Sequence, residues 1–211
     1  MKILVVAAHP DDEVLGCGGT IARHVMDGDQ VIIAIAVSHA FTHDQPEGPD
    51  IIDAARDAAR VLGVEQTIFL EYQDQRLDLC PLIQITQSIE GVAADVKPDI
   101  VYTHQAGDLN KDHRIVHEGA LTAFRPPGPD VYCFEVPSST EWGLAPFEPD
   151  HFVNIGGTMA RKIRALKCYA TEMRDPPHPR SYEGVDCLAK QRGYTVGFRR
   201  AEAFKTIRTM R

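Results

Sequence analysis

Two continuous apolar runs near the amino terminus most constrain how this chain can fold. The runs ILVVAA at residues 3–8 and VIIAIAV at residues 31–37 contain no polar side chain. Such runs are typical of strands that are buried on both faces of a parallel sheet. Segments with helical apolar spacing alternate with these and further short strands. We predict strands at residues 3–8, 31–37, 67–70, 99–103 and 131–136, and helices at residues 13–26, 50–64, 81–96 and 113–124.

This alternation predicts an α/β protein with a Rossmann-like, mostly parallel sheet and helices on both of its faces. After residue 136 the pattern changes to a weak strand and three helices, at residues 153–157, 158–173, 180–192 and 199–208. We therefore expect a single domain over residues 1–211, with a Rossmann-like part over about 1–136 and a smaller helical C-terminal elaboration over about 137–211. A chain of 211 residues can bury a core without disulfides or structural metals.

Charge and composition exclude several classes of protein. The formal net charge of −8 disfavours nucleic acid as a partner, because a phosphate-binding face needs an excess of Lys and Arg. The five cysteines are scattered and form no CxxC pair, which favours reduced thiols over a disulfide framework. We see neither a signal peptide before the first strand nor an apolar stretch long enough to span a membrane. We expect a cytoplasmic protein with no membrane partner.

Side chains that can bind metals follow two of the predicted strands. His-Pro-Asp-Asp-Glu occupies residues 9–13, and THQAGDLNKDHRIVH occupies residues 103–117. In open α/β sheets, ligands bind beyond the carboxyl ends of the strands, so both segments are expected at the same rim. His9 and Asp12 in the first segment and His113 in the second could supply three protein ligands to a catalytic zinc, with an open position for water.

The remaining acidic residues of these segments then have distinct predicted roles. Asp11 would lie beside the metal as a general base, and Asp112 would orient an imidazole. We expect one Zn²⁺ per chain, although Fe²⁺, Co²⁺ or Mn²⁺ would also suit two histidines and an aspartate.

Two simpler interpretations compete with a metal site. In the first, the carboxylates of residues 11–13 bind no metal and simply complement the dipole at the start of a helix. The glycines of GCGGT at residues 16–20 could belong to a dinucleotide fingerprint, but that fingerprint should follow the strand directly, where HPDDE stands. The glycines more simply allow the first helix to approach the sheet or a ligand closely.

The segments AHPDDEVLGCGGTIARH at residues 8–24 and GDLNKDHRIVHEGAL at residues 107–121 resemble the PIG-L/LmbE family of zinc-dependent deacetylases. The resemblance extends to LGV, DQRLD, EVPSSTEW and HPRSYE later in the chain, and so covers most of it. It implies a Rossmann-like fold and hydrolysis of an N-acetyl group from an N-acetylglucosamine-type sugar or sugar conjugate. Matched by motif, the zinc ligands are His9, Asp12 and His113, and the general base is Asp11.

One position departs from the family pattern. Many members have His-Pro-Asp-His where this chain has Asn110-Lys111-Asp112-His113, so an imidazole is missing and Asn110 is left to donate a hydrogen bond. The family also uses a histidine from its carboxy-terminal part. His178 is our candidate, either to stabilise the oxyanion or to protonate the departing amine.

Other polar and aromatic residues of the rim loops are candidate substrate contacts. Arg180 could bind a phosphate or hydroxyl, Arg76 and Asp74 could bind sugar hydroxyls, and Trp142 could stack on a sugar ring. The candidate contacts are Asn110, Asp108, His104, Arg76, Arg180 and Trp142.

The family resemblance also suggests a homo-oligomer. Two alternatives stay open: a zinc hydrolase acting on an amide that is not part of a sugar, and a non-catalytic sugar- or nucleotide-binding module.

Overall fold

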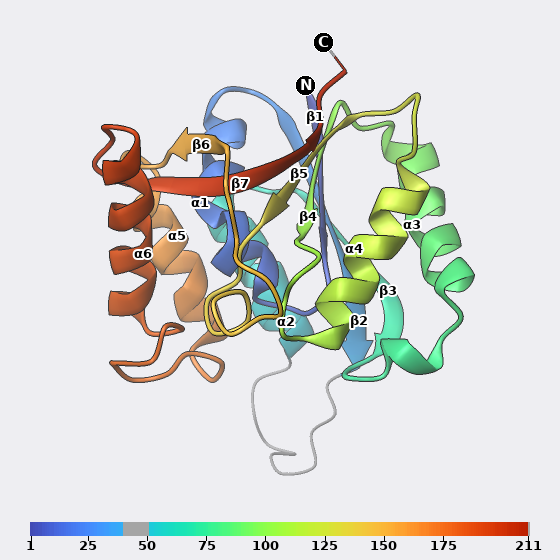
Figure 1. Ribbon diagram of the computed structural model, residues 1–211, viewed down its shortest axis with the longest axis horizontal. Coiled ribbons are helices and arrows are strands. Elements are labelled where there is room, and N and C mark those ends of the chain that lie inside the picture. The colour runs from blue at the N-terminus through green and yellow to red at the C-terminus, as the bar shows by residue number, and fades with distance from the viewer. Residues whose placement is uncertain (40–50, 211) are drawn as a thin grey trace.

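The apolar runs predicted as strands form the centre of a sheet in the computed structural model, which describes residues 1–39 and 51–210 (Figure 1). Within this described part the sheet has seven strands in the order β3-β2-β1-β4-β5-β7-β6. The first five are parallel, whereas β7 runs antiparallel to both β5 and β6. The strands are β1 (Lys2–Ala7), β2 (Gln30–His39), β3 (Gln66–Gln73), β4 (Ile100–His104), β5 (Asp130–Phe134), β6 (His151–Asn154) and β7 (Ala201–Arg208). This confirms the predicted α/β class and the mostly parallel sheet.

Helices cover both faces of the sheet, as Figure 1 shows. They are α1 (Asp12–Met26), α2 (Ile51–Leu62), α3 (Leu82–Val96), α4 (Lys111–Ala123), α5 (Met159–Leu166) and α6 (Tyr182–Thr195), with two short 3₁₀ helices, η1 (Leu77–Leu79) and η2 (Lys167–Tyr169). None of the helices in the described ranges is long and apolar enough to cross a bilayer.

The side chains of β1 alternate between two separate apolar cores. Ile3 and Val5 pack in a core with residues of α1, α2, α5 and α6. Leu4 and Val6 pack in a second core with residues of α3 and α4. All four side chains have no exposed surface, because both faces of this central strand are covered. The continuous apolar run in the sequence follows from this double burial.

The end of the chain differs from the prediction. Residues 199–208 were expected to form a helix, but Ala201–Arg208 form strand β7, between β5 and β6. Backbone groups at the edge of β5 offer hydrogen-bond partners to this segment, and such pairing overrides a weak local helical preference. The predicted helix at residues 158–173 also ends early, as α5 and then η2. The carboxy-terminal part is therefore not purely helical, since it adds two antiparallel strands to the sheet.

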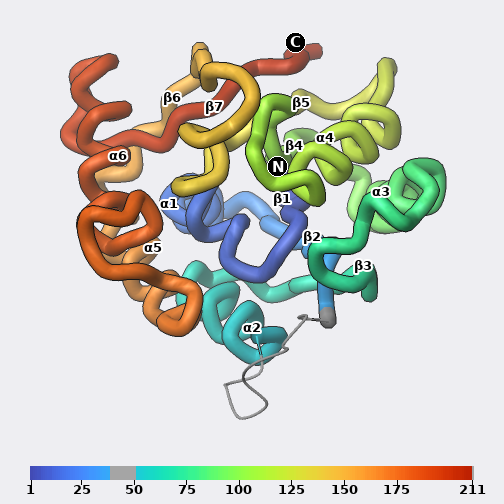
Figure 2. The backbone as a smooth tube through the Cα atoms, turned by 60° about the horizontal axis from the view of Figure 1, so that its bottom comes forward, coloured from blue at the N-terminus to red at the C-terminus, as the bar shows by residue number. Residues whose placement is uncertain are grey.

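The carboxyl ends of β1 and β4 bring the two polar segments together. These strands are direct neighbours, with Val6 paired to Thr103. The chain then enters α1 after β1 and α4 after β4, so both helices begin at the same edge of the sheet. Figure 2 looks toward this edge, with the blue connection between β1 and α1 near its centre.

Candidate metal-dependent active site

Three side chains at this edge form a compact triangle of metal-ligand atoms. His9 lies in the turn after β1, Asp12 begins α1, and His113 lies in the first turn of α4. Asp12 Oδ2 is 3.1 Å from His9 Nδ1 and 3.1 Å from His113 Nε2, and the two nitrogens are 3.2 Å apart. Ligands at 2.0–2.1 Å around a tetrahedral zinc are separated by roughly 3.3 Å. The observed donor triangle therefore fits a single ion, and the structure brings the three predicted ligands together.

The electrostatics of the triangle favour a positive charge. Burial alone lowers the pKa of His9, but hydrogen bonds to Asp112 and Asp12 raise it to about 10. Burial likewise lowers the pKa of His113, but the charge of Asp12 and the contact with Asp108 raise it to about 9. Burial raises the pKa of Asp12, yet both imidazoles hold it well below its usual range. Acidic groups that attract protons this strongly also favour a divalent cation.

Two aspartates hold the imidazoles from behind. Asp112 Oδ2 is 3.2 Å from His9 Nε2, and its other oxygen accepts a hydrogen bond from the backbone N–H of Leu77. The imidazole that Asp112 contacts is therefore that of His9. Asp108 Oδ2 lies 3.2 Å from His113 Nδ1. With a carboxylate on the far nitrogen of each ring, Nδ1 of His9 and Nε2 of His113 are directed toward the shared ligand position.

Asp108 and His104 do not line the pocket as substrate contacts would. Both are fully buried. Asp108 accepts hydrogen bonds from Ser139 and Thr140 in addition to its contact with His113. Each lies behind the histidine that faces the pocket, and their predicted contact with a substrate stays a prediction.

His104 supports the site through its ring. Its Nε2 accepts a hydrogen bond from the backbone N–H of Ala8 at 2.8 Å, and its ring stacks on His113 with centroids 4.0 Å apart. Burial, and then the charge of His113, hold the pKa of His104 well below its usual range. A neutral His104 therefore supports the turn after β1 and one face of the His113 ring.

Asp11 occupies a strained position beside the triangle. Its φ of 106° lies in a region that non-glycine residues rarely adopt, and such strain is typical of functional turns. The side chain is 3 % exposed, and its Oδ2 is 3.1 Å from Arg180 Nη1. Burial raises the pKa of Asp11 well above its usual range, although Arg180 opposes the shift. A carboxylate with a raised pKa is suited to take a proton near neutral pH.

Glu13 is the third carboxylate of the HPDDE segment, and the metal-site hypothesis gave it no role. Its Oε2 accepts a hydrogen bond from the backbone N–H of Asp11 at 3.0 Å, and its Oε1 accepts one from the Tyr169 hydroxyl at 2.6 Å. Burial raises the pKa of Glu13 to about 7, against the effect of the Tyr169 hydrogen bond. Glu13 therefore fixes the strained turn at Asp11. Tyr169 was not predicted either, because it lies 156 residues away in the sequence.

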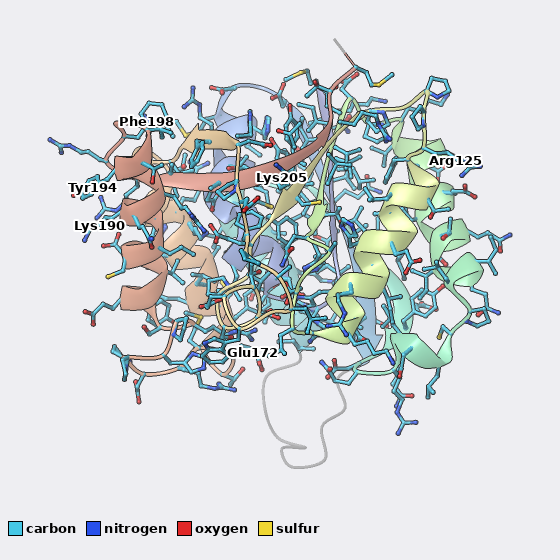
Figure 3. The ribbon with its side chains drawn as sticks, in the orientation of Figure 1. Arg125, Glu172, Lys190, Tyr194, Phe198 and Lys205 are labelled. Atoms are coloured by element: carbon cyan, nitrogen blue, oxygen red, sulfur yellow. The ribbon has the colours of Figure 1, made fainter. Side chains whose placement is uncertain are left out.

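The triangle opens into a pocket of about 180 Å³. Asp11 and all three candidate ligands line it, and Asn110 and Arg180 line it as predicted substrate contacts would. Asn110 also caps α4, because its Oδ1 accepts a hydrogen bond from the Asp112 N–H at 2.8 Å. Other polar residues on its wall are Asp74, Gln75 and Glu172. Figure 3 labels Glu172 at this edge of the molecule.

Gln75 and Glu172 were not predicted as site residues. Gln75 is next to Asp74 in a predicted rim loop, and this position in the sequence is the one feature that could have marked it as a site residue. Glu172 follows η2 in the carboxy-terminal part, and no sequence motif marks it.

Besides Asp108, His104 and Asp112, three further predicted residues lie outside the pocket lining. Trp142 is 52 % exposed, and its ring forms a T-shaped contact with the His178 ring, with centroids 5.4 Å apart. His178 Nδ1 accepts a hydrogen bond from the backbone N–H of Arg180 at 3.1 Å. Arg76 is exposed in the turn before η1. Their predicted roles toward a substrate remain predictions. The sheet rule also predicts the loop at residues 38–49 at this rim, and most of that loop lies outside the described residues.

Sequence comparison identifies the family to which this site belongs. The family model described as PIG-L, GlcNAc-PI de-N-acetylase, matches residues 4–124. This chain belongs to the PIG-L family. The matched segment contains His9, Asp11, Asp12 and His113, and it ends before Arg180. One relative of this PIG-L family chain is the uncharacterized deacetylase YaiS of Escherichia coli, which is 33 % identical over 141 residues, or 65 % of this chain and 75 % of YaiS.

Solved structures share the PIG-L fold of this chain. An N,N'-diacetylchitobiose deacetylase from Pyrococcus horikoshii superposes with a TM-score of 0.77 at 21 % identity, over 98 % of this chain and 83 % of that chain. GalB, a 4-carboxy-2-hydroxymuconate hydratase from Pseudomonas putida, superposes with a TM-score of 0.78 at 24 % identity, over 100 % and 97 %. At these identities the likeness shows the fold alone. Because the fold occurs in a deacetylase and in a hydratase, the reaction has to be argued from the site.

Proposed function

We propose that this chain is a zinc-dependent N-deacetylase. It hydrolyses the acetamide group of an N-acetylglucosamine-type sugar or sugar conjugate and releases acetate and the amine. The observation that carries this proposal is the donor triangle of His9, Asp12 and His113 with the Asp11 carboxylate beside it in one pocket. Membership of the PIG-L family and the names of relatives such as YaiS support hydrolysis of an amide.

The proposed mechanism assigns a task to each of these side chains. His9, Asp12 and His113 would hold the zinc, which when bound polarises an amide carbonyl and lowers the pKa of water from 15.7 toward about 7. Asp11 takes the proton from the attacking water and then gives it to the departing amine. Arg180, 3.1 Å from Asp11 Oδ2, orients the Asp11 carboxylate between these two proton transfers.

The charges on the pocket wall favour an uncharged sugar as substrate. Asp74 and Glu172 line the pocket beside Asp11, and Arg180 is already engaged by Asp11. A substrate with several carboxylates, such as the 4-carboxy-2-hydroxymuconate of GalB, would face these acidic groups. Sugar hydroxyls instead can donate hydrogen bonds to Asp74 and Glu172 and accept them from Asn110 and Gln75.

We keep the remaining predicted contacts as part of the proposal. His178 would stabilise the oxyanion, or protonate the amine in place of Asp11, and Arg76 and Trp142 would contact parts of the substrate beyond the acetamide. Assembly as a homo-oligomer and a cytoplasmic location also remain predictions.

Metal content is the first test of this proposal. The parent protein, purified without added metal or chelator, is expected to contain about one zinc per chain, and His113→Ala is expected to lose it. His151→Ala is the matched control, because His151 lies on β6 and is not part of the metal-ligand clusters found among the described residues. A parent protein that binds no zinc even when zinc is supplied would overturn the proposal.

Amine release from a panel of N-acetylated compounds is the second test. N-acetylglucosamine and its disaccharides should be hydrolysed faster than N-acetyl amino acids, and Asp11→Asn should keep its zinc but lose most of its turnover. Preference for a non-sugar amide would correct the substrate class. Sugar binding without any amine release would favour the non-catalytic module, and consumption of 4-carboxy-2-hydroxymuconate would favour a hydratase.

A further inference from the structure

Helix α1, which begins with Asp12, is broken at Cys17. This residue has φ −141° and ψ 22°, which are not helical angles. In a continuous helix the N–H of Gly19 would donate to the carbonyl of Leu15, four residues earlier. Here the Gly19 N–H donates to Glu202 Oε1 at 2.9 Å, and the Leu15 carbonyl accepts from Lys162 Nζ at 2.7 Å. Two side chains from elsewhere in the chain are thus inserted into the hydrogen-bond ladder of α1.

The two inserted side chains form a buried ion pair. Lys162 Nζ is 2.6 Å from Glu202 Oε1, and the side chains are 4 % and 5 % exposed. Glu202 Oε2 also accepts from the backbone N–H of Thr20 at 2.6 Å. A neighbouring residue, Thr158, donates its hydroxyl to the carbonyl of Gly19 at 2.8 Å. The backbone groups around the break are therefore satisfied by α5, its N-cap residue and β7.

Stability alone is a weak reason for such a pair. Removing two charges from water costs several kcal/mol, and apolar residues of similar volume often stabilise a protein as well or better. A buried pair can instead fix one local geometry, since each charge has to meet a defined set of hydrogen-bond partners. The hydrogen-bond partners of Lys162 and Glu202 in α1 are backbone groups just before and just after Cys17.

The break lies one turn away from the candidate active site. The segment between them, residues 12–16, carries Asp12 and follows Asp11 directly. The N–H of Leu15 donates to the carbonyl of Asp11 at 2.8 Å, while the carbonyl of Leu15 accepts from Lys162. A continuous path of hydrogen bonds therefore leads from the ion pair through Leu15 to the backbone of Asp11.

We infer that Lys162 and Glu202 are positioning residues for the metal site. They hold the first turn of α1 at the angle that brings Asp11 and Asp12 to His113, and neither residue touches the pocket. The inference rests on the metal site in the proposed function. It assigns a role in this site to the carboxy-terminal part, which lies outside the segment matched by the family model.

The test compares zinc affinity in Glu202→Gln with that in the parent protein. The variant keeps the size of the side chain but leaves the charge of Lys162 without its partner. We expect the zinc dissociation constant, measured by competition with a chromophoric chelator well below the melting temperature, to rise about tenfold or more, as for residues that support metal ligands. We also expect kcat for the best substrate to fall more than KM changes.

Asp186→Asn is the matched control. Asp186 pairs with Arg200 and Lys190 in the same carboxy-terminal part, whereas Glu202 accepts hydrogen bonds from the backbone of α1. This variant should lower the melting temperature without changing zinc affinity. If Glu202→Gln binds zinc as tightly as Asp186→Asn does, the positioning role is wrong and the pair only stabilises the fold.

A readout without metal separates this inference from the proposed function. In chelator-treated proteins, hydrogen exchange in residues 12–20 should be faster in Glu202→Gln than in the parent, with no such local change in Asp186→Asn. Unchanged hydrogen exchange in residues 12–20 would overturn the inference, whether or not the parent binds zinc. A parent that binds no zinc would overturn the proposed function instead. If Glu202→Gln does not fold, Thr158→Val, which removes one hydrogen bond to Gly19, is judged by the same two measurements.

Discussion

Gly16 offers a sharp test of how α1 packs on the sheet. A Cβ placed on Gly16 would lie 2.3, 2.7 and 2.9 Å from three ring atoms of Phe134. Phe134 has no exposed surface, so its ring cannot move into solvent. Forcing extra atoms into a packed core costs about 1–3 kcal/mol, and contacts this short place Gly16→Ala at the upper end. The gain in helix propensity returns about 1 kcal/mol.

The expected net effect of Gly16→Ala is a loss of about 2 kcal/mol, from a cost of about 3 and a gain of about 1. For a domain of this size that corresponds to a melting temperature lower by roughly 4–8 °C. Gly91→Ala is the matched control, because a Cβ on Gly91 in α3 would meet nothing within 4 Å. It should raise the melting temperature by roughly 2–4 °C, since only the propensity term remains.

Thermal unfolding followed by circular dichroism measures both changes. A second readout connects the packing to the site, because the Phe134 ring lies 4.8 Å from the His104 ring, which stacks on His113. We therefore expect Gly16→Ala also to weaken zinc binding, and Phe134→Leu in the same chain to restore part of the stability. If Gly16→Ala is as stable as Gly91→Ala, the close contact of α1 with β5 is refuted.

Three further predictions concern capping, pH and metal removal. Asn110→Ala removes the cap that accepts from the Asp112 N–H, so it should cost about 1 kcal/mol in urea unfolding, whereas Asn110→Asp should cost far less; equal losses would contradict the capping role. Burial raises the pKa of Asp150, but hydrogen bonds from Lys205 and from the backbone lower this pKa from 3.8 to about 2. The parent should therefore exceed Asp150→Asn in stability by less than about 1 kcal/mol above pH 4, and lose this advantage as the pH falls toward 2, because a lowered pKa stabilises only while the carboxylate is ionised; an advantage that grows in acid would refute this. Chelation should lower both the melting temperature and the rate of amine release, and added Zn²⁺ should restore them; a chelated protein with full activity would show that no metal is needed.

The sequence predicted the first five strands because each is read from its own side chains. Residues 3–8 are typical of a strand buried on both faces, because a short continuous run of aliphatic side chains leaves no polar face for solvent. The final strand could not be predicted in this way. Residues 201–208 become β7 only because β5 and β6 lie on either side of them and supply backbone partners, and no local pattern records those neighbours.

The residues of the candidate site likewise divide into those that local sequence predicts and those that depend on the tertiary structure. His9, Asp11, Asp12 and His113 could be found because they lie in short motifs at the carboxyl ends of two strands, where the sheet rule alone places them together. The carboxy-terminal part brings Glu172, Tyr169 and Arg180 to this edge, after the chain has passed through all strands but the last. Of these the sequence predicted only Arg180, and it did not predict the ion pair of Arg180 with Asp11. The approach of these three residues depends on how α5 and the segment after it pack on α1 and α2, which is a property of the assembled core.

Local sequence determined the chemistry of this protein, because the identity and spacing of ligand-type residues are fixed by the chain itself. The α/β fold was determined with it, through periodicity of apolar side chains. Only the tertiary structure decided the geometry that makes this chemistry usable. It placed Asp108 and His104 behind His113 rather than in the pocket. It also fixed the break in α1 with an ion pair, Lys162 and Glu202, whose members come from distant parts of the sequence. The physical reason is that burial and hydrogen-bond partners belong to pairs of segments, and neither segment alone carries a record of the other.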